Sequence, residues 1–322
     1  MNVMSSLLEQ YWSWHKEYSK QYGSDKTIVL VEKGHFMECY GTEDIGNAKL
    51  LSKLLNMTLT KTNSNKTLSD KNPYMSGFPK AKASKNIPIL LENDIYVVWV
   101  EQIHDSQDRL IDRKVTRVIT PGTYISEDDT NSDYNFICCI ARNYGFCMID
   151  LSIGCVYVRD YFTEEDINRI LETYKPNEVL LCNTKYVLSD KSTFEKYIPE
   201  YFKSDYQKEV YNKIYPNYTF SYIFDNQCNE DTKAAFCCLV DHINTCHPLS
   251  LEVIQPIQLL ESKNTLILHN NAIGQLNLLT NNSKGIKGSL FHVINHTSTS
   301  MGKRMLKRRL LNPLVDINQI QL

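Results

Sequence analysis

An aromatic ring and a carboxylate stand two residues apart in the run Lys33-Gly34-His35-Phe36-Met37-Glu38. If this run forms a strand, alternation places the side chains of Phe36 and Glu38 on the same face. An exposed pair of this kind suits duplex DNA, because the ring can wedge or stack against a base while the carboxylate hydrogen-bonds the base edge. The simpler alternative is a strand with one core phenylalanine and one solvated glutamate.

A lysine-rich stretch follows this pair. Between Lys61 and Lys85 there are six lysines and one acidic residue, Asp70, which is a local excess of five positive charges in a chain of net charge −2. The lysines are Lys61, Lys66, Lys71, Lys80, Lys82 and Lys85. The stretch is a candidate phosphate-contacting loop. Its Asn, Ser and Pro content equally suits a mobile, solvated loop.

The composition is that of an ordinary globular protein. At 322 residues, with 42% hydrophobic and 22% charged residues, the chain should divide into about two or three domains and is neither disordered nor fibrous. The near-neutral charge means that any nucleic-acid surface must be a local patch. We expect no membrane span or secretory signal, because Glu9, His15 and Lys16 interrupt the N-terminal segment.

Ten cysteines lie mostly inside apolar patterns, so reduced, buried thiols in an intracellular protein are expected. Cys238, His242 and Cys246 recur at helical spacing and have the chemistry of zinc ligands. A structural zinc site usually contains a C-x-x-C knuckle, which the sequence lacks, so a half-buried helix stripe is the preferred interpretation and no metal is expected.

Two polar, turn-rich stretches separate three blocks, and the fold class expected is multidomain α/β. The first block, residues 1–124, has a helical repeat from Leu7 to Tyr18 that ends near Gly23, and a strand over 27–31. The Phe36 strand follows after a bend at Gly34. A helix is predicted from Thr42 to about Leu55, and further strands at 95–100 and 114–120.

The second block, residues 135–248, has three strand-like runs (135–140, 146–152 and 155–161), then a helix capped by Thr163, a strand at 178–181 and a helix near 231–244. This is a ribonuclease-H-like order. Because such folds often carry nucleases, Asp150, Asp160 and Glu178 are possible metal-binding carboxylates, although fold analogy alone says little about chemistry.

The third block, residues 249–322, looks helical and incomplete. Leu259 and Leu266 lie two helical turns apart, and residues 271–279 could continue the pattern. From Ser300 to Leu311 the apolar and basic residues fall on opposite halves of a helix, apart from Arg309, and Pro313 stops it. The basic half could contact DNA or be solvated.

Several motifs occur in an order that resembles the N-terminal part of a MutS-type DNA mismatch-recognition protein. Gly34-His35-Phe36-Met37-Glu38 is similar to that family's G-x-F-Y-E, and Met75-Ser76-Gly77-Phe78-Pro79 to its M-A-G-I-P. The remaining matches are Glu101-Gln102-Ile103 (E-Q-I), residues 114–123 (K-V-x-R-x-x-T-P-G-T), residues 149–154 (L-D-x-S-x-G) and residues 299–314 (T-x-M-G-x-R-x-L-K-R-W-L-x-x-P-L). The matches fall in all three blocks.

The resemblance implies a mismatch-binding domain (1–124), a ribonuclease-H-like connector (135–248) and the start of an α-helical core (249–322). It implies that Phe36 stacks in the minor groove on a mispaired or looped base, while Glu38 hydrogen-bonds that base. Lys61, Lys66, Lys80 and Lys82 would contact the phosphate backbone. The partner would be mismatched double-stranded DNA, and other repair proteins could bind through the connector.

The sequence departs from the family pattern in four places. Met37 replaces Tyr, Tyr74 replaces Pro, and Arg309 replaces a core Trp. No G-x-x-x-x-G-K-[ST] loop occurs, so this chain is not expected to be an enzyme or to bind a cofactor, and ATP and magnesium are expected only in a full-length parent. The alternative is a truncated module that acts through the connector on repair partners. Composition does not distinguish a cytoplasmic, nuclear, organellar or viral location.

Overall fold

A computed structural model of the chain describes residues 6–124, 134–160, 163–186, 193–217, 222–260, 265–266, 268, 272–280 and 285–321. The chain forms two compact units, Met1–Asp128 with Thr245–Pro248, and Asp129–Asn244 with Leu249–Leu322. The second and third expected domains share the second unit, so the boundary between residues 248 and 249 stays a prediction. Most of the expected linker, together with Tyr161 and Asn271 at predicted element ends, lies outside the described residues.

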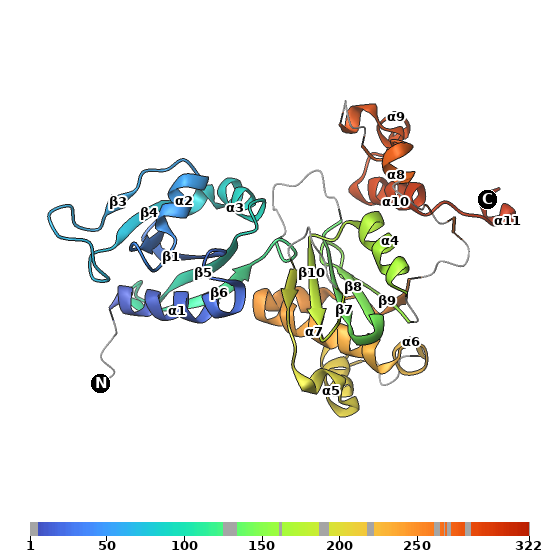
Figure 1. The fold of residues 1–322 in the computed structure, drawn as a ribbon, viewed down its shortest axis with the longest axis horizontal. Helices are drawn as coiled ribbons and strands as arrows, with labels where there is room; N and C mark the ends of the chain where they lie inside the picture. Colours follow the sequence, from blue (N-terminus) through green and yellow to red (C-terminus); the bar gives the residue numbers. More distant parts are fainter. Residues whose placement is uncertain are drawn as a thin grey trace. The chain divides into compact units, whose positions relative to one another are not determined.

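The first unit is built on a mixed sheet in the order β3-β4-β2-β1-β5-β6, in which β1 and β5 are parallel and the other neighbours antiparallel. The first five residues of β1 and the first five of β5 are buried, because helices cover both faces of the sheet (Figure 1). The strands are β1 (Thr27–Lys33), β2 (Phe36–Gly41), β3 (Thr60–Lys61), β4 (Tyr74–Pro79), β5 (Tyr96–His104) and β6 (Leu110–Ile119).

Helix α1 lies on one face of this sheet, and α2 and α3 lie on the other (Figure 1). A capping box starts α1, since Ser6 and Glu9 each accept a hydrogen bond from the other's backbone N–H, and Gly23 ends it with a φ of +91°. The predicted first helix is therefore confirmed. The helical segments of the unit are α1 (Leu7–Tyr22), α2 (Ala48–Leu54), the 3₁₀ turn η1 (Lys80–Lys82) and α3 (Ala83–Leu91).

Two predictions for this unit are wrong in detail. The helix expected from Thr42 begins only at Ala48, because the Thr42 hydroxyl accepts from the Asp44 and Ile45 N–H groups in a local turn and Gly46 takes a φ of +81°. The lysine-rich stretch is not one loop. Lys61 ends β3, residues 62–73 connect β3 to β4, and β4, η1 and the start of α3 occupy the rest.

The sheet of the second unit has the order β11-β10-β7-β8-β9-β12. Strands β7, β8 and β9 form an antiparallel meander, and β10, β11 and β12 add in parallel at its edges. This confirms the predicted ribonuclease-H-like order. The strands are β7 (Phe136–Ala141), β8 (Phe146–Asp150), β9 (Cys155–Arg159), β10 (Glu178–Cys182), β11 (Thr193–Glu195) and β12 (Gln258–Leu259).

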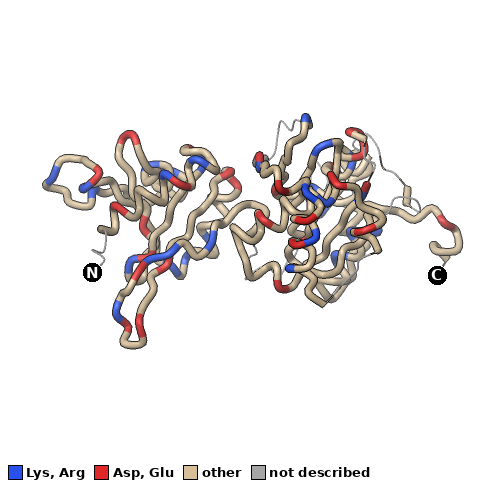
Figure 2. The backbone as a smooth tube through the Cα atoms, turned by 90° about the horizontal axis from the view of Figure 1, so that it is seen from below, with Lys and Arg blue, Asp and Glu red and all other residues tan. Residues whose placement is uncertain are grey.

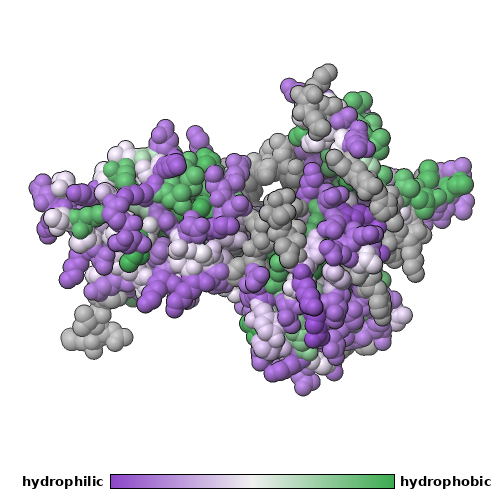
Figure 3. All heavy atoms as spheres, in the orientation of Figure 1, coloured by the Kyte–Doolittle hydropathy of each residue, from purple (hydrophilic) through white to green (hydrophobic). Residues whose placement is uncertain are grey.

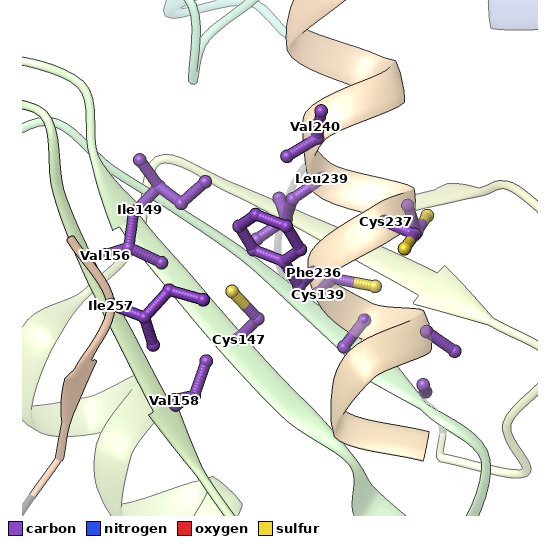
Figure 4. Packing of buried hydrophobic residues seen from close by; sticks show 14 of the residues in the cluster. Cys139, Cys147, Ile149, Val156, Val158, Phe236, Cys237, Leu239, Val240 and Ile257 are labelled. Carbon is purple, nitrogen blue, oxygen red and sulfur yellow. The ribbon is translucent and has the colours of Figure 1, made fainter. Parts of the chain in front are cut away.

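Helices cover both faces of this sheet. The α7 face packs Phe236 and Leu239 against Cys147, Ile149 and other strand residues (Figure 4), and the α4 face buries Ile167 and Ile170. Thr163 caps α4 as predicted, through a capping box with Asp166. The helices of this part are η2 (Arg142–Tyr144), α4 (Glu164–Tyr174), η3 (Pro199–Phe202), α5 (Ser204–Ile214), α6 (Tyr222–Asn226), α7 (Glu230–Cys246) and η4 (Pro248–Val253).

The end of the chain differs from the predicted helical pattern. Leu259 lies in β12, paired with β9, and the Leu266 N–H donates to the Pro313 carbonyl oxygen at 2.6 Å, so neither leucine is itself helical. The helical segments described here are α8 (Ala272–Gln275), η5 (Ile286–Gly288), α9 (Leu290–Ile294), α10 (Ser300–Leu311) and α11 (Ile317–Ile320).

Helix α10 has the predicted bounds, but its apolar half is more exposed, and its basic half less solvated, than the sequence pattern predicted. Met301 is 73% exposed and Met305 is 50% exposed. On its basic side, Lys307 lies over the Phe291 ring and Arg308 over the Tyr157 ring. The apolar half is therefore partly open to solvent while two basic residues pack on aromatic rings. Exposed apolar surface also marks α11 (Figure 3).

Lys and Arg alternate with Asp and Glu over both units (Figure 2), which agrees with the small net charge. None of the described helices is long and apolar enough to cross a membrane. All ten cysteines are free thiols, and only Cys155 is not fully buried, as the predicted reduced state requires.

Candidate nucleic-acid interface

The Phe36 side chain stands at the start of a tight hairpin. Lys33 pairs with Phe36, so the connection between β1 and β2 is the two-residue turn Gly34-His35. Gly34 has a φ of +59°, which the first central position of a type II′ turn requires and glycine provides without strain. The predicted bend at Gly34 is confirmed, and it fixes which face of β2 each following side chain occupies.

Alternation along β2 separates the core residues from the candidate pair. Met37 and Cys39 are fully buried beneath α2 and α3, whereas Phe36 and Glu38 point to the other face. The Phe36 side chain is 49% exposed, which is unusual because burial of an aromatic ring stabilises the folded protein. The prediction of an exposed aromatic is confirmed, and the alternative of a core Phe36 is wrong.

Glu38 is less exposed than the sequence suggested, because its side chain retains only 14% accessibility. The Tyr40 hydroxyl donates a short hydrogen bond to Glu38 Oε2, and Lys33 Nζ lies 3.3 Å from the same oxygen. Burial and the hydrogen bond to this carboxylate raise the pKa of Tyr40, so its hydroxyl stays a donor at neutral pH. Among the described residues, Oε1 accepts no hydrogen bond and is left for another donor.

Strand β4 lies very close to β2 beside Glu38. Gly77 pairs with Glu38, and Pro79 with Phe36. A Cβ atom on Gly77 would lie 2.4 Å from the Met37 carbonyl oxygen, so only glycine fits between these strands. Sequence reasoning treated Gly77 only as part of a motif; a glycine in the middle of a strand was the signal that two backbones approach closely.

Three of the four predicted phosphate ligands are exposed. Lys61 ends β3, Lys66 lies in the following loop, and Lys82 ends η1. Lys80 is different, because its Nζ lies 2.8 Å from Glu32 Oε1 and 2.9 Å from Glu101 Oε1. Its ammonium is already balanced by two carboxylates, so it is the least suited of the four to bind phosphate. None of the four assignments is tested by these positions alone.

Asn72 organises the loop that carries Lys66. Its buried side-chain amide donates to the carbonyl oxygens of Asn63, Lys66 and Thr67 and accepts from the Asn63 N–H, all within 3.1 Å. The Trp12 indole N–H also donates to the Asp70 carbonyl oxygen. The loop therefore has internal hydrogen bonds that fix its path, in contrast to an open, fully solvated loop.

The carboxylates considered for a nuclease do not converge. Asp150 is the last residue of β8 and, two residues after Met148, lies on the same α4-covered face of the sheet. Its carboxylate accepts hydrogen bonds from the Ser152 hydroxyl and the Asn135 N–H. Glu178 lies on the same face of β10 as Leu180, which is the face covered by α7, and its Oε1 is 3.4 Å from His242 Nε2. Asp160 follows the opposite end of the meander.

The candidate zinc ligands also have other surroundings. Cys238 lies 3.7 Å from the Lys196 carbonyl oxygen, and His242 faces Glu178. No group of three His, Cys, Asp or Glu side chains with metal-binding geometry occurs in the part of the chain that the structure describes. The cluster is the buried stripe of α7.

Family comparisons agree with the arrangement of the first unit. The model of MutS domain I matches residues 5–128, which contain the Phe36 hairpin, and the model of MutS domain III matches residues 271–322. Together they cover more than half of the chain. The chain belongs to the MutS family.

The MutS relatives align over all or nearly all of this chain. A DNA mismatch repair protein MutS of Halothermothrix orenii is 28% identical over 100% of the chain, and one of Petrotoga mobilis is 27% identical over 100%. A third, from Acholeplasma laidlawii, is 26% identical over 96%. The chain spans 36%, 38% and 34% of the lengths of these MutS proteins, respectively, so it corresponds to little more than a third of each.

Proposed function

We propose that the first unit of this MutS-family chain recognises mispaired or looped duplex DNA. The observation that carries the proposal is the half-exposed Phe36 ring at the hairpin, on the same face as a partly shielded Glu38. The relatives are named DNA mismatch repair proteins, which supports the same assignment.

Phe36 acts as the wedge in this proposal. A ring inserted from the minor groove must unstack a base step at a cost of a few kcal/mol. A mispaired base is cheaper to unstack because its pairing is already poor. The difference between these costs makes the wedge selective, and the kink that accompanies insertion adds selectivity at flexible lesion sites.

Glu38 adds selectivity through an unfavourable charge. Its carboxylate is repelled by the phosphates of any duplex, and only a base that turns a donor toward it compensates for the repulsion. Tyr40 and Lys33 hold one carboxylate oxygen, so the other is oriented before DNA binds.

The exposed lysines Lys61, Lys66 and Lys82 supply contacts to the phosphate backbone that do not depend on sequence. Binding of ATP and magnesium is assigned only to a longer protein that contains this chain. The connector, residues 135–248, is proposed as the contact surface for other repair proteins. The alternative of a pure interaction module is not favoured by any contact among the described residues.

The test is binding of the purified chain to fluorescent duplexes that differ only by a G·T mismatch, measured by anisotropy at several salt concentrations. We expect tighter binding to the mismatched duplex. Phe36→Ala should reduce the preference to about one, while residual binding keeps its salt dependence because phosphate contacts remain.

Tyr197→Ala is the matched control, since Tyr197 is a 54% exposed aromatic residue in the second unit. It should leave the preference unchanged. Equal affinity of the unmodified chain for the two duplexes would overturn the proposed function, and an unchanged preference in Phe36→Ala would overturn the wedge assignment.

A further inference from the structure

A lysine bridges two carboxylates on the opposite face of the sheet from the Phe36 ring. Glu32 on β1 is the cross-strand partner of Met37, and Glu101 on β5 is two residues after Trp99. Because Met37 and Trp99 belong to the core under α2 and α3, both carboxylates lie on that face of the sheet. Lys80, directly after β4, places its Nζ 2.8 Å from Glu32 Oε1 and 2.9 Å from Glu101 Oε1. One side chain thus connects three strands of the sheet.

The same residues hold the turn that precedes Phe36. The Lys80 backbone N–H donates to the His35 carbonyl oxygen at 2.8 Å, and the Gly34 N–H donates to Gln102 Oε1 at 3.1 Å. The Gln102 N–H in turn donates to Glu32 Oε2 at 3.0 Å. Both residues of the two-residue turn are therefore tied to the network around Lys80 and Glu32.

The charges of this network are matched internally. Partial burial lowers the pKa of Lys80, but its hydrogen bonds to Glu32 and Glu101 outweigh burial, so the pKa is raised overall. Burial raises the pKa of Glu101, but the hydrogen bonds from Lys80 and from the Trp99 indole N–H lower it by more, so the pKa is lowered overall. The indole nitrogen lies 3.1 Å from Glu101 Oε1. Without the ammonium, two carboxylates would face each other across β1 and β5.

We propose that Lys80 is a positioning residue for the mismatch wedge and not a phosphate ligand. By linking Glu32 to Glu101 it holds the Gly34-His35 turn in place, and the turn fixes where the Phe36 ring stands. The proposal rests on the proposed function and adds to it a residue that acts from the far face of the sheet. A wedge displaced by even a fraction of an ångström stacks less well, so selectivity depends on this support.

Two substitutions separate positioning from phosphate contact. Lys80→Met removes the charge and keeps the length of the side chain, and Glu32→Gln removes a negative charge from the same network. A phosphate role for Lys80 predicts weaker binding to both duplexes and a salt slope smaller by about one. If only net charge mattered, Glu32→Gln would bind both the matched and the mismatched duplex as tightly as the unmodified chain, or more tightly.

Positioning predicts a different result for both variants. Each should lose at least about fivefold of its mismatch preference, the effect of one lost hydrogen bond, while the salt slope and the affinity for matched duplex change little. Lys82→Met is the matched control: this exposed lysine is two residues away, and its loss should weaken binding to both duplexes and lower the slope.

A second measurement needs no DNA. With ¹⁵N-glycine labelling only twelve glycines give signals, so hydrogen exchange at the Gly34 amide can be followed directly. We expect faster exchange at Gly34 in Lys80→Met and Glu32→Gln, with Gly23 unchanged as a reference for correct folding. Lys80→Arg should restore both protection and preference in part, because it keeps the charge.

The outcomes are distinct. Absence of preference in the unmodified chain overturns the proposed function, whereas unchanged Gly34 exchange in Lys80→Met overturns the positioning role whatever the DNA result. Preserved preference with a reduced salt slope in that variant also overturns it and restores the phosphate assignment.

Discussion

Glu38 meets two opposing demands, since phosphate repels its carboxylate and yet the residue stands beside the ring that would enter the duplex. We predict that Glu38→Gln binds matched duplex more tightly and loses part of its mismatch preference, each by roughly fivefold, because the repulsion disappears and a weaker neutral acceptor remains. The same anisotropy assay measures both effects. Glu43→Gln is the control, because Glu43 is an exposed carboxylate paired with Lys49. Equal changes in the two variants would mean that net charge alone is responsible.

Strand periodicity was enough to predict which face a side chain occupies. It could not predict ion pairs or hydrogen bonds with residues far away in the sequence. Alternation along β2 sufficed to place Phe36 and Glu38 on one face. The partial burial of Glu38 depends on Lys33 and Tyr40, and the pairing of Lys80 depends on Glu32, 48 positions earlier, which no local pattern encodes. Charge counting alone therefore grouped Lys80 with the exposed lysines.

At the scale of elements, the loop over residues 62–73 depends on a single buried amide. We predict that Asn72→Ala destabilises the first unit by about 1–3 kcal/mol, because the Asn63 N–H and three carbonyl oxygens lose their partner. Urea unfolding followed by tryptophan fluorescence measures this, since all three tryptophans (Trp12, Trp14 and Trp99) lie in that unit. Asn65→Ala, at an exposed position of the same loop, should change stability little. Equal stability of the two variants would contradict the role of Asn72.

Elements with strong local signals were predictable. The capped helices α1 and α4, the apolar β5 and the meander β7–β9 all follow from caps and apolar patterns. Strand β4 was missed, because its Gly77 and Pro79 disfavour strands and its formation depends on pairing with β2. Leu259 and Leu266 had helical spacing by coincidence, and pairing with β9 placed Leu259 in a strand.

At the scale of the whole molecule, two units with separate cores should lose their structure in separate steps. Fluorescence of the three tryptophans monitors the first unit, whereas eight of the ten cysteines lie in the second. Thiol labelling and tryptophan fluorescence therefore provide independent signals from the two units along one urea titration.

We predict that native protein at pH 8 reacts rapidly with a thiol reagent only at Cys155, the one cysteine that is not fully buried. Burial blocks access to the other cysteines, and it raises the pKa of Cys139 to about 11 and that of Cys237 to about 12, so the reactive thiolate is scarce at these two positions. Cys155→Ser should abolish the rapid phase. In urea, the seven other thiols of the second unit should become reactive in a transition whose midpoint differs from that of tryptophan fluorescence. Asn72→Ala should move the fluorescence midpoint and leave the thiol midpoint in place. If both midpoints move together, the two units unfold as one cooperative structure, and the separation of their cores has no thermodynamic consequence.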